Sequence, residues 1–579
     1  MALKAEFVAL LQNNDIPSES AIREVTESLK APLNKLREID IEIHRLCELV
    51  ENLKIKRQSI QKIIDDHNVI LSPVRRLPVD ALHEIFFQCL PTHRNPIMES
   101  SEAPVLLTRI CSSWRAIALS SPRIWSRIHI PLPGDPRFSR EYGLITDETT
   151  LNTRRQLFAG VLQRRCDVVR RWLSRSGTCP LSISITHPGT LANAPIPNDE
   201  LSHEMFDVLL SFADRWSDVD ISMPEELHST LQANIQPSMF PSLKSLKVQL
   251  SRDYHVNYME PTHIELLAAP GLRSITIRAA WVPADPVLRP SWNHLTHITF
   301  ASSITDTFFL VLLQKCPNLV FGHFMVNSLH WPDEPHMDQV DQDIVLPCLE
   351  SLAVIDSGRE GFMSIIFKAI LAPALTRLSY HWFSSHSRDD DSIPLPAPVI
   401  PLLSKSTIIS NLLLGGELSS QDIKEILRRG EQVTHIVFDK PPPSNGYRPT
   451  DPYTARPDAF DLKLLLINSS AETPLPRLES LEAYFIASFT DEDILNLIKT
   501  RVDAFKRGEA TALKSVKIYF QRRKQQDIIE EVSRLAKEAD IEVKLDLVYV
   551  LKGFAIFDRL SPSFGLLSND RMWSSEFVI

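Results

Sequence analysis

Residues 243–248 read LKSLKV, and the same arrangement of apolar residues returns many times along the chain. It consists of a leucine, two variable residues, a second leucine, one variable residue and an apolar residue. Its last three positions alternate apolar, variable and apolar, which is the period of a β-strand with one buried face. The motif therefore predicts a strand, and its repetition predicts a stack of similar units.

The motif begins at residues 243, 272, 295, 349, 375, 433, 478 and 513, after a first alternating strand, LSISI, at 181–185. Weaker copies are WSDVDI at 216, LVFGHF at 319 and IISNLL at 408–413. Most starts lie 23 to 35 residues apart, which leaves room for a strand and a returning helix such as EEVSRLAKEA at 530–539. The pattern resembles an irregular leucine-rich repeat. That resemblance implies an α/β solenoid over residues 178–550 with its strands on the concave side.

The leucines of the motif face the interior, so the residues between them line the concave face of the sheet. The residues that we expect to bind a target there are Lys247, Arg278, His297, Arg377, His435, Lys517 and Tyr519, among polar neighbours such as Ser245, Thr276, Ser379 and Glu482. This mixture is polar and partly basic, which suits a protein or peptide of acidic character. Any solvated sheet face is also polar, so composition alone does not separate the two readings.

The N-terminal region has a different periodicity. Alternate steps of three and four residues connect Leu36, Ile39, Ile43, Leu46, Val50, Leu53, Arg57, Ile60, Ile64, His67 and Leu71. Nine of these eleven positions are apolar, which predicts a coiled-coil helix beginning near Pro32 and ending before Pro73. A homodimer through residues 36–71 and a hairpin folded back on Ser20–Lys30 are equal alternatives.

Residues 75–90, RRLPVDALHEIFFQCL, have an apolar face wider than a short surface helix needs. They predict a helix from Pro78 to Leu90, and a second helix is expected from Leu106 to Leu119, before Pro122. The order is Leu-Pro, then Leu and Ile-Phe at helical spacing, then Ile-Cys-x-x-Trp-Arg and Pro-x-x-Trp. This ordered set resembles the F-box.

The resemblance to the F-box implies a three-helix module, here residues 73–130, that docks the Skp adaptor of cullin-based ubiquitin ligases. The residues that it places at the adaptor are Leu77, Pro78, Leu82, Ile85, Phe86, Leu107, Ile110, Cys111 and Trp114. Residues 92–103, THRNPIMESSEA, lengthen a loop that is short in most F-boxes. With the preceding heptad helix, this looks like the large F-box families of mushroom-forming fungi. The alternative is a helical linker that caps the rest of the protein.

The remaining segments complete a mixed α and β organisation. We expect a helical coiled-coil region at 1–72, the F-box at 73–130, a linker and amphipathic helix at 131–177, the repeats at 178–550 and a tail or cap at 551–579. The amphipathic helix, residues 151–176, is expected to turn Leu157, Leu162, Val169 and Trp172 inward, with Gly177 as its C-cap. Its seven arginines indicate a solvated face.

Composition and short motifs argue against several classes of function. The 579-residue chain has a net charge of −10, which argues against a protein built to hold nucleic acid or an anionic membrane. Seven scattered cysteines, never spaced C-x-x-C, indicate thiols in a reducing compartment, cytosol or nucleus. No apolar run approaches membrane-spanning length. His83-Glu84 and His203-Glu204 lack the second histidine of a zinc helix, and no phosphate-binding or nucleophile loop occurs. We therefore expect no metal, no cofactor and no enzymatic activity.

The function expected from these features is that of a substrate receptor in a Skp–cullin–F-box ubiquitin ligase. The F-box would hold the Skp adaptor and the repeats would hold a protein target. One alternative is a coiled-coil and leucine-rich-repeat scaffold outside any ligase. Another is a nucleic-acid binder that uses the arginine helix, which the net charge disfavours.

Overall fold

The structure is a computed structural model. It describes residues 16–71, 73–132, 137–139, 143–187, 200–251, 264–278, 291–327, 342–357, 362–382, 397–416, 420–438, 462–467, 473–486, 489–520 and 522–549, with Val8, Leu11 and Leu418. The expected tail or cap at 551–579 lies outside the described residues. The chain forms two units, Met1–Leu82 and His83–Ile579, and each is treated by itself.

The first unit consists mainly of one long helix, α2 (Glu19–Leu71), followed by the short 3-10 helix η1 (Pro73–Arg76). The expected start at Pro32 is wrong, because the helix passes through this proline without interruption. Proline removes one backbone hydrogen bond, but the turns on either side continue the helix. Ser20–Lys30 belongs to the same continuous helix, so the hairpin alternative is also wrong.

The second unit is built on one sheet of fourteen strands that follow one another in chain order, each parallel to its neighbours. The strands are β1 (Arg127–Pro131), β4 (Leu181–Thr186), β5 (Trp216–Pro224), β6 (Ser245–Ser251), β7 (Ser274–Arg278), β8 (His297–Thr305), β9 (Phe321–Asn327), β11 (Ser351–Asp356), β13 (Arg377–Trp382), β14 (Asn411–Gly416), β15 (His435–Phe438), β16 (Ser480–Ile486), β17 (Ser515–Phe520) and β18 (Lys544–Tyr549). Two short pairs stand apart: β2 (Phe138–Ser139) with β3 (Gly143–Leu144), and β10 (Ile344–Val345) with β12 (Ile370–Leu371).

Every copy of the repeat motif, including the three weaker ones, coincides with a strand of this sheet. The first leucine of the motif precedes the strand and is buried, as Leu243 and Leu272 show. Strands β1 and β18 were not expected. The first lies within residues assigned to the F-box, so the sheet begins about fifty residues before the expected start of the repeats at 178.

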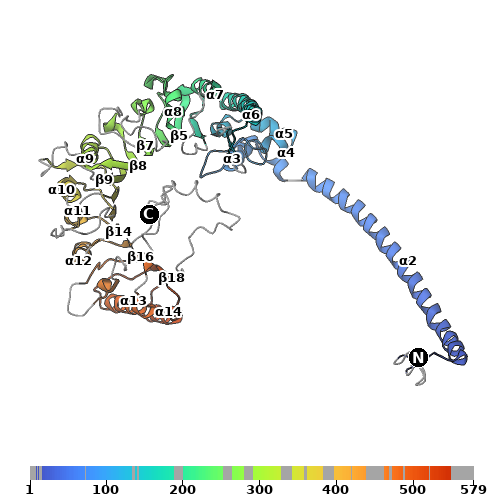
Figure 1. Ribbon diagram of the computed structural model, residues 1–579. Coiled ribbons are helices and arrows are strands. Elements are labelled where there is room, and N and C mark those ends of the chain that lie inside the picture. Colours follow the sequence, from blue (N-terminus) through green and yellow to red (C-terminus); the bar gives the residue numbers. More distant parts are fainter. Residues whose placement is uncertain are drawn as a thin grey trace. The chain divides into compact units, whose positions relative to one another are not determined.

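Helices connect successive strands. They are α6 (Glu148–Arg175), α7 (Glu200–Leu210), α8 (Glu225–Gln232), α9 (Asp306–Lys315), α10 (Phe362–Ala369), α11 (Val399–Lys405), α12 (Ser420–Arg429), α13 (Asp491–Lys506) and α14 (Ile529–Glu538). Short 3-10 helices are η3 (Ala213–Arg215), η4 (Pro237–Met239), η5 (Glu265–Ala268), η6 (Trp292–His294) and η7 (Leu462–Leu465). Neighbouring helices such as α9, α10, α11 and α12 pack in sequence, and Figure 1 shows them along one side of the strands.

The helices cover the face of the sheet that carries the repeat leucines. The ring of Phe309 in α9 lies 4.9 Å from that of Phe324 in β9, and the ring of Phe367 in α10 lies 5.8 Å from that of Tyr380 in β13. Apolar burial between helix and sheet is the main stabilising contribution of such a layered unit. The opposite face of the strands has mainly half-buried and exposed side chains, although Ser351, Ala353, His381 and Leu413 are nearly covered.

The helix at residues 151–176 confirms most of its expected pattern as α6. Leu162, Val169 and Trp172 are buried, and Gly177 has a φ of +57° just past the end of the helix, as a glycine C-cap requires. Leu157 was expected to face inward, but it is 63% exposed. Periodicity alone predicted the inward position of Leu157, whereas Leu151, nearer the start of the helix, is buried.

A buried carboxylate joins the last elements of the sheet. Asp491, at the start of α13, accepts hydrogen bonds from Arg522 (2.9 Å), from the backbone N–H groups of Gln525 (2.7 Å) and Gln526 (2.9 Å), and from the Tyr549 hydroxyl (2.8 Å). Burial alone would raise the pKa of Asp491, but these hydrogen bonds outweigh it and lower the pKa to about 2. The ionised carboxylate therefore ties α13 to β18 and to the chain before α14.

We expect Asp491→Asn to lower the free energy of unfolding by about 1–3 kcal/mol at neutral pH, because donors aimed at a carboxylate lose their acceptor. The folded pKa lies below the ordinary value, so this contribution is present above about pH 4 and is lost as the pH falls toward 2. Thermal denaturation across that range should show a smaller acid destabilisation in the variant than in the wild type. The exposed neighbour Glu492, changed to Gln, is the control. Equal pH profiles for wild type and Asp491→Asn would contradict the assignment.

Candidate protein-interaction surfaces

The residues that resemble the F-box form α3 (Val79–Gln88), α4 (Leu107–Ile110), α5 (Ser112–Leu119) and the 3-10 helix η2 (Pro122–Trp125). The single helix expected over 106–119 is wrong. Cys111 is extended, with φ −156° and ψ 171°, and its Sγ accepts a hydrogen bond from the Trp114 backbone N–H at 3.4 Å. The thiol thereby acts as the N-cap of α5, so the chain turns between two helices.

Aromatic rings hold this helical module together and attach it to α6. The rings of Phe86 in α3 and Trp114 in α5 lie 4.9 Å apart. Trp125 is buried, donates its indole N–H to the Ala118 carbonyl at 2.7 Å and packs edge-on against Trp172 of α6, with centroids 4.9 Å apart. Such aromatic pairs stabilise beyond the area that they bury.

The nine expected adaptor residues fall into two groups. Leu82, Phe86 and Leu107 are buried, with 5%, 0% and 3% of their surface exposed, so they hold the module and cannot face a partner in this conformation. The others reach solvent: Leu77 (37%), Ile85 (41%) and Ile110 (53%) in particular, with Pro78 and Cys111 exposed and Trp114 half-buried. The module also exposes Leu106 (41%) and Leu119 (39%), which the expected set omits.

These exposed side chains belong to a module that already has a buried core. Ile85, Leu106 and Ile110 each remain more than one third exposed although Phe86 and Leu107, their neighbours in sequence, are fully covered. Scattered apolar residues on a surface are ordinary, but large ones concentrated on one small helical unit mark an interaction surface. The helical module is therefore the first candidate surface.

The lengthened loop, residues 92–103, fastens the helical module to the first strand of the sheet. Arg127 of β1 donates hydrogen bonds to the carbonyl oxygens of Pro91 (3.0 Å) and Arg94 (2.7 Å) and to the Asn95 side-chain oxygen (3.2 Å). The His129 backbone N–H donates to the Pro96 carbonyl at 2.8 Å. We call residues 91–97 the clamp loop, because it joins the helices to the sheet through named polar contacts.

Within the lengthened loop, residues 92–103, the carboxylate of Glu102 fixes the backbone conformation through hydrogen bonds. Glu102 accepts hydrogen bonds from the Arg94 guanidinium and from the Ile97 backbone N–H at 2.9 Å. Burial would raise the pKa of Glu102, but the hydrogen bond from Arg94 and that from Ile97 lower it below its ordinary value. The lengthened loop is thus an ordered connection between the helical module and strand β1.

We expect Arg127→Lys to loosen the clamp loop, because lysine keeps the charge but lacks the forked guanidinium donors that three acceptors share. Hydrogen exchange of the peptide spanning residues 91–106 should become faster than in the wild type, by roughly tenfold for a loss of about 1.4 kcal/mol. The exposed Arg109, changed to Lys, is the control. Unchanged exchange in Arg127→Lys would show that the loop is held by other contacts.

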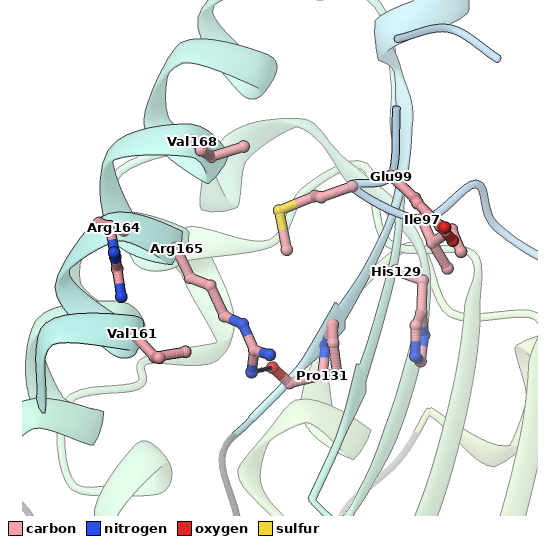
Figure 2. A pocket seen from close by; sticks show the side chains of 9 residues that line it. Ile97, Glu99, His129, Pro131, Val161, Arg164, Arg165 and Val168 are labelled. Atoms are coloured by element: carbon pink, nitrogen blue, oxygen red, sulfur yellow. Dashed lines mark hydrogen bonds between the residues drawn. The ribbon is translucent and has the colours of Figure 1, made fainter. Parts of the chain in front are cut away.

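A hollow of about 600 Å³ lies beside the clamp loop. In Figure 2, Ile97, His129 and Pro131 form one side and Val161, Arg165 and Val168 of α6 the other. The Arg165 guanidinium donates to the Pro131 carbonyl, and Arg164 Nε donates to the Gly160 carbonyl at 2.9 Å. Its walls are largely apolar and its arginines already bond to carbonyls, so it can accept an apolar side chain of a partner more readily than an anion.

The open face of the sheet is the second candidate surface. All seven expected target residues lie on it, in rows fixed by the strand register. His297, Arg377 and His435 share one row, which also contains Ser274, Phe321, Ser351 and Asn411. Lys247 and Lys517 belong to the next row along the strands, and Arg278 and Tyr519 lie two residues further on.

The expected basic character of this face is only partly present. Lys247 lies 3.5 Å from Asp220 on the neighbouring strand, and Lys517 lies 3.3 Å from Glu482. Each cation thus meets a carboxylate across the ladder, a pairing that the motif in one strand cannot reveal. The lysines at both ends of the sheet are therefore compensated within the sheet and do not form a basic patch for an acidic target.

The middle of the open face, strands β9 to β15, presents several large apolar side chains, although β13 within it contributes Arg377, Ser379 and His381. Its outward positions include Phe321, Met325, Ile355, Leu413 and Val437. Val437 belongs to a well-formed copy, and Met325 and Ile355 directly follow one copy each, whereas Phe321 and Leu413 lie in the weaker repeats LVFGHF and IISNLL. Those copies are weak because apolar residues also occupy positions that are polar in the better ones. We call this part of the face the apolar centre.

Two histidines of the open face, His323 in β9 and His297 in the neighbouring strand β8, have lowered pKa values. Burial, and then the proximity of His381, lower the pKa of His323 to about 4. Burial also lowers the pKa of His297, whose ring stacks on that of Phe321 at 6.1 Å, while the charge of Glu350 opposes the shift. At neutral pH His323 and His297 therefore present uncharged imidazoles, and the charged Arg377 of β13 lies on the same face.

The part of the chain that the structure describes offers neither a metal site nor a membrane-spanning helix. No group of three or more histidine, cysteine or acidic residues is arranged there to hold a metal ion. Among the same residues, no helix is both long enough and apolar enough to cross a membrane.

Comparison with known proteins adds little to this geometry. No protein-family model matches the chain, and no curated protein matches it. Among solved structures, a protein of Bacteroides fragilis shares 9% identity, with a TM-score of 0.20, over 63% of this chain and 64% of that one. The chain thus spans less than two thirds of that protein, and a likeness at this TM-score bears on neither fold nor function.

Proposed function

We propose that this protein is a substrate receptor of a Skp–cullin–F-box ubiquitin ligase, acting in the cytosol or nucleus. The helical module docks the Skp adaptor and the open face of the sheet holds a protein target. The protein itself makes and breaks no bond, since ubiquitin transfer belongs to other subunits. The repeating units are proposed to be an irregular leucine-rich-repeat solenoid.

The observation that carries the adaptor proposal is the apolar exposure of the helical module. Ile85 and Ile110 come from two of its helices and are 41% and 53% exposed. Buried Phe86 and Trp125 hold the helices in place independently of these side chains. The exposed residues are therefore not needed for the core and can contact a partner. Leu77 and Pro78, which belong to the motif that resembles the F-box, are also exposed.

The target proposal follows from the strand register. An apolar centre flanked by compensated ion pairs favours a target segment with apolar side chains rather than an acidic one. Charged groups at the rim of an interface fix orientation, while buried apolar groups at its centre supply most of the affinity. Phe321, Met325 and Ile355 are the residues that we place at the centre of target recognition.

We expect Ile85→Asp with Ile110→Asp to strip the Skp adaptor and cullin from the purified protein. Each substitution puts a charge into a desolvated contact, and the loss of such an anchor costs about 2–4 kcal/mol, or roughly thirty- to a thousand-fold in affinity. Leu77→Ala with Pro78→Ala should also lower the affinity for the Skp adaptor. Titration calorimetry with purified adaptor would measure this affinity in the variants and in the wild type.

The matched control for this experiment is Ile408→Asp with Ile529→Asp, two isoleucines of similar exposure, 44% and 54%, elsewhere in the chain. These should leave adaptor affinity unchanged. Circular dichroism and the melting temperature must match the wild type in both double variants, since the substituted side chains are exposed. Wild-type adaptor affinity in Ile85→Asp/Ile110→Asp would defeat the proposal and favour the scaffold alternative.

We expect Met325→Asp with Ile355→Asp to abolish capture of targets while adaptor binding survives, because the two surfaces lie on different elements. Proteins retained by the wild type under proteasome inhibition would be quantified by mass spectrometry against the variant. Lys247→Ala with Lys517→Ala is the comparison, and these side chains are already paired within the sheet. If the lysine variant loses the captured set and the apolar variant keeps it, recognition is electrostatic and the apolar centre is not the site.

A further inference from the structure

Helix α2 presents a continuous apolar stripe to solvent. Along residues 36–71 its apolar seam side chains are between 45% (Leu46) and 69% (Leu71) exposed. Because the helix is unbroken from Glu19, the same heptad spacing extends back through Leu29 and Val25 to Ile22. The stripe therefore runs about 75 Å at the rise of an α-helix. An isolated helix is marginal in water and is stabilised mainly by packing of its apolar face.

We propose that α2 pairs with α2 of a second copy of this chain in a parallel two-stranded coiled coil, which makes the protein a dimer with two helical modules and two sheets. The stripe has the period that a left-handed coiled coil requires, and its own pattern is complementary to itself. A seam of this length offers more than enough surface for a stable interface, which needs about 1,200–2,000 Å².

The central heptads of the seam, residues 43–53, have the composition of two parallel strands, whereas Leu36 at a and Ile39 and Ile60 at d depart from it. In heptad notation Ile43 and Val50 occupy a positions, and Leu46 and Leu53 occupy d positions. β-Branched residues at a with leucine at d favour parallel dimers over trimers and tetramers. In a parallel pair, Lys35 at a g position also faces Asp40 at the following e position of the other chain, an attractive contact.

The charged residues of α2 support the same arrangement. Ion pairs between Arg45 and Glu42 (2.6 Å) and between Lys54 and Glu51 (3.3 Å) join residues outside the a and d positions. Arg57 at an a position and His67 at a d position are the exceptions. Polar residues at isolated seam positions lower stability but fix register and strand number, because a shifted pairing would bury them against apolar side chains.

Light scattering of the full chain tests the association. The wild type should have twice the 65.7 kDa chain mass, and Leu46→Asp with Val50→Asp should have the mass of one chain. The control is Ile41→Asp with Ile55→Asp. These two isoleucines are 70% and 58% exposed but lie on the outer side of the helix, so this variant should stay dimeric. A wild-type monomer, a mass of three or four chains, or a control that dissociates with the seam variant would overturn the proposal.

Disulfide trapping tests the orientation. In a Cys47→Ser background, Ile64→Cys should form a covalent dimer under mild oxidation, because parallel pairing brings the two copies of one a position into the same layer. In an antiparallel pair, residue 64 would instead lie near residue 29 of the other chain. Covalent dimers that require both Leu29→Cys and Ile64→Cys would overturn the parallel arrangement. The dimer does not depend on the proposed ligase function, so adaptor binding by monomeric Leu46→Asp/Val50→Asp separates the two.

Discussion

The parallel hydrogen-bonded ladder from β1 to β18 is the constraint on which the rest of the second unit depends. A strand in a parallel sheet satisfies its backbone groups only through its two neighbours, so each repeat must keep the register of the one before it. The register places the leucines of every copy against the helices. It also places the intervening residues in straight rows on the open face. A shift by one residue in any strand would expose its leucines.

The same ladder brings together residues that are far apart in the sequence. Lys247 meets Asp220 and Lys517 meets Glu482 because their strands are adjacent. Met325 and Ile355 are neighbours on adjacent strands for the same reason. The helical module is tied into this order at β1, through Arg127 and the clamp loop, and at α6, through the contact of Trp125 with Trp172. From His83 onward, the helical module and the open face of the sheet are thereby parts of one connected unit.

Periodicity identified the strands well, because the repeat motif encodes both burial and alternation. It missed β1 because Ile128 and Ile130 fall within residues assigned to the F-box, and β18 because this last strand has one neighbour and carries only part of the pattern. β18 illustrates this, with outward-facing and inward-facing residues that are all at least partly exposed. The break at Cys111 was also missed, because the residues on both sides have helical spacing and the thiol cap is a local contact that periodicity does not encode.

The sequence by itself determined the two periods of this protein: a heptad repeat along residues 22–71 and a leucine repeat along the sheet. Both follow from which side chains avoid water at regular spacing, and that is a property of neighbours in the chain. Only the tertiary structure decided which members of the F-box-like set are buried and which are exposed. It also decided that the basic residues of the open face are paired and that its centre is apolar. These properties depend on which strands and helices become neighbours in space, and the spacing of residues along one segment does not record that.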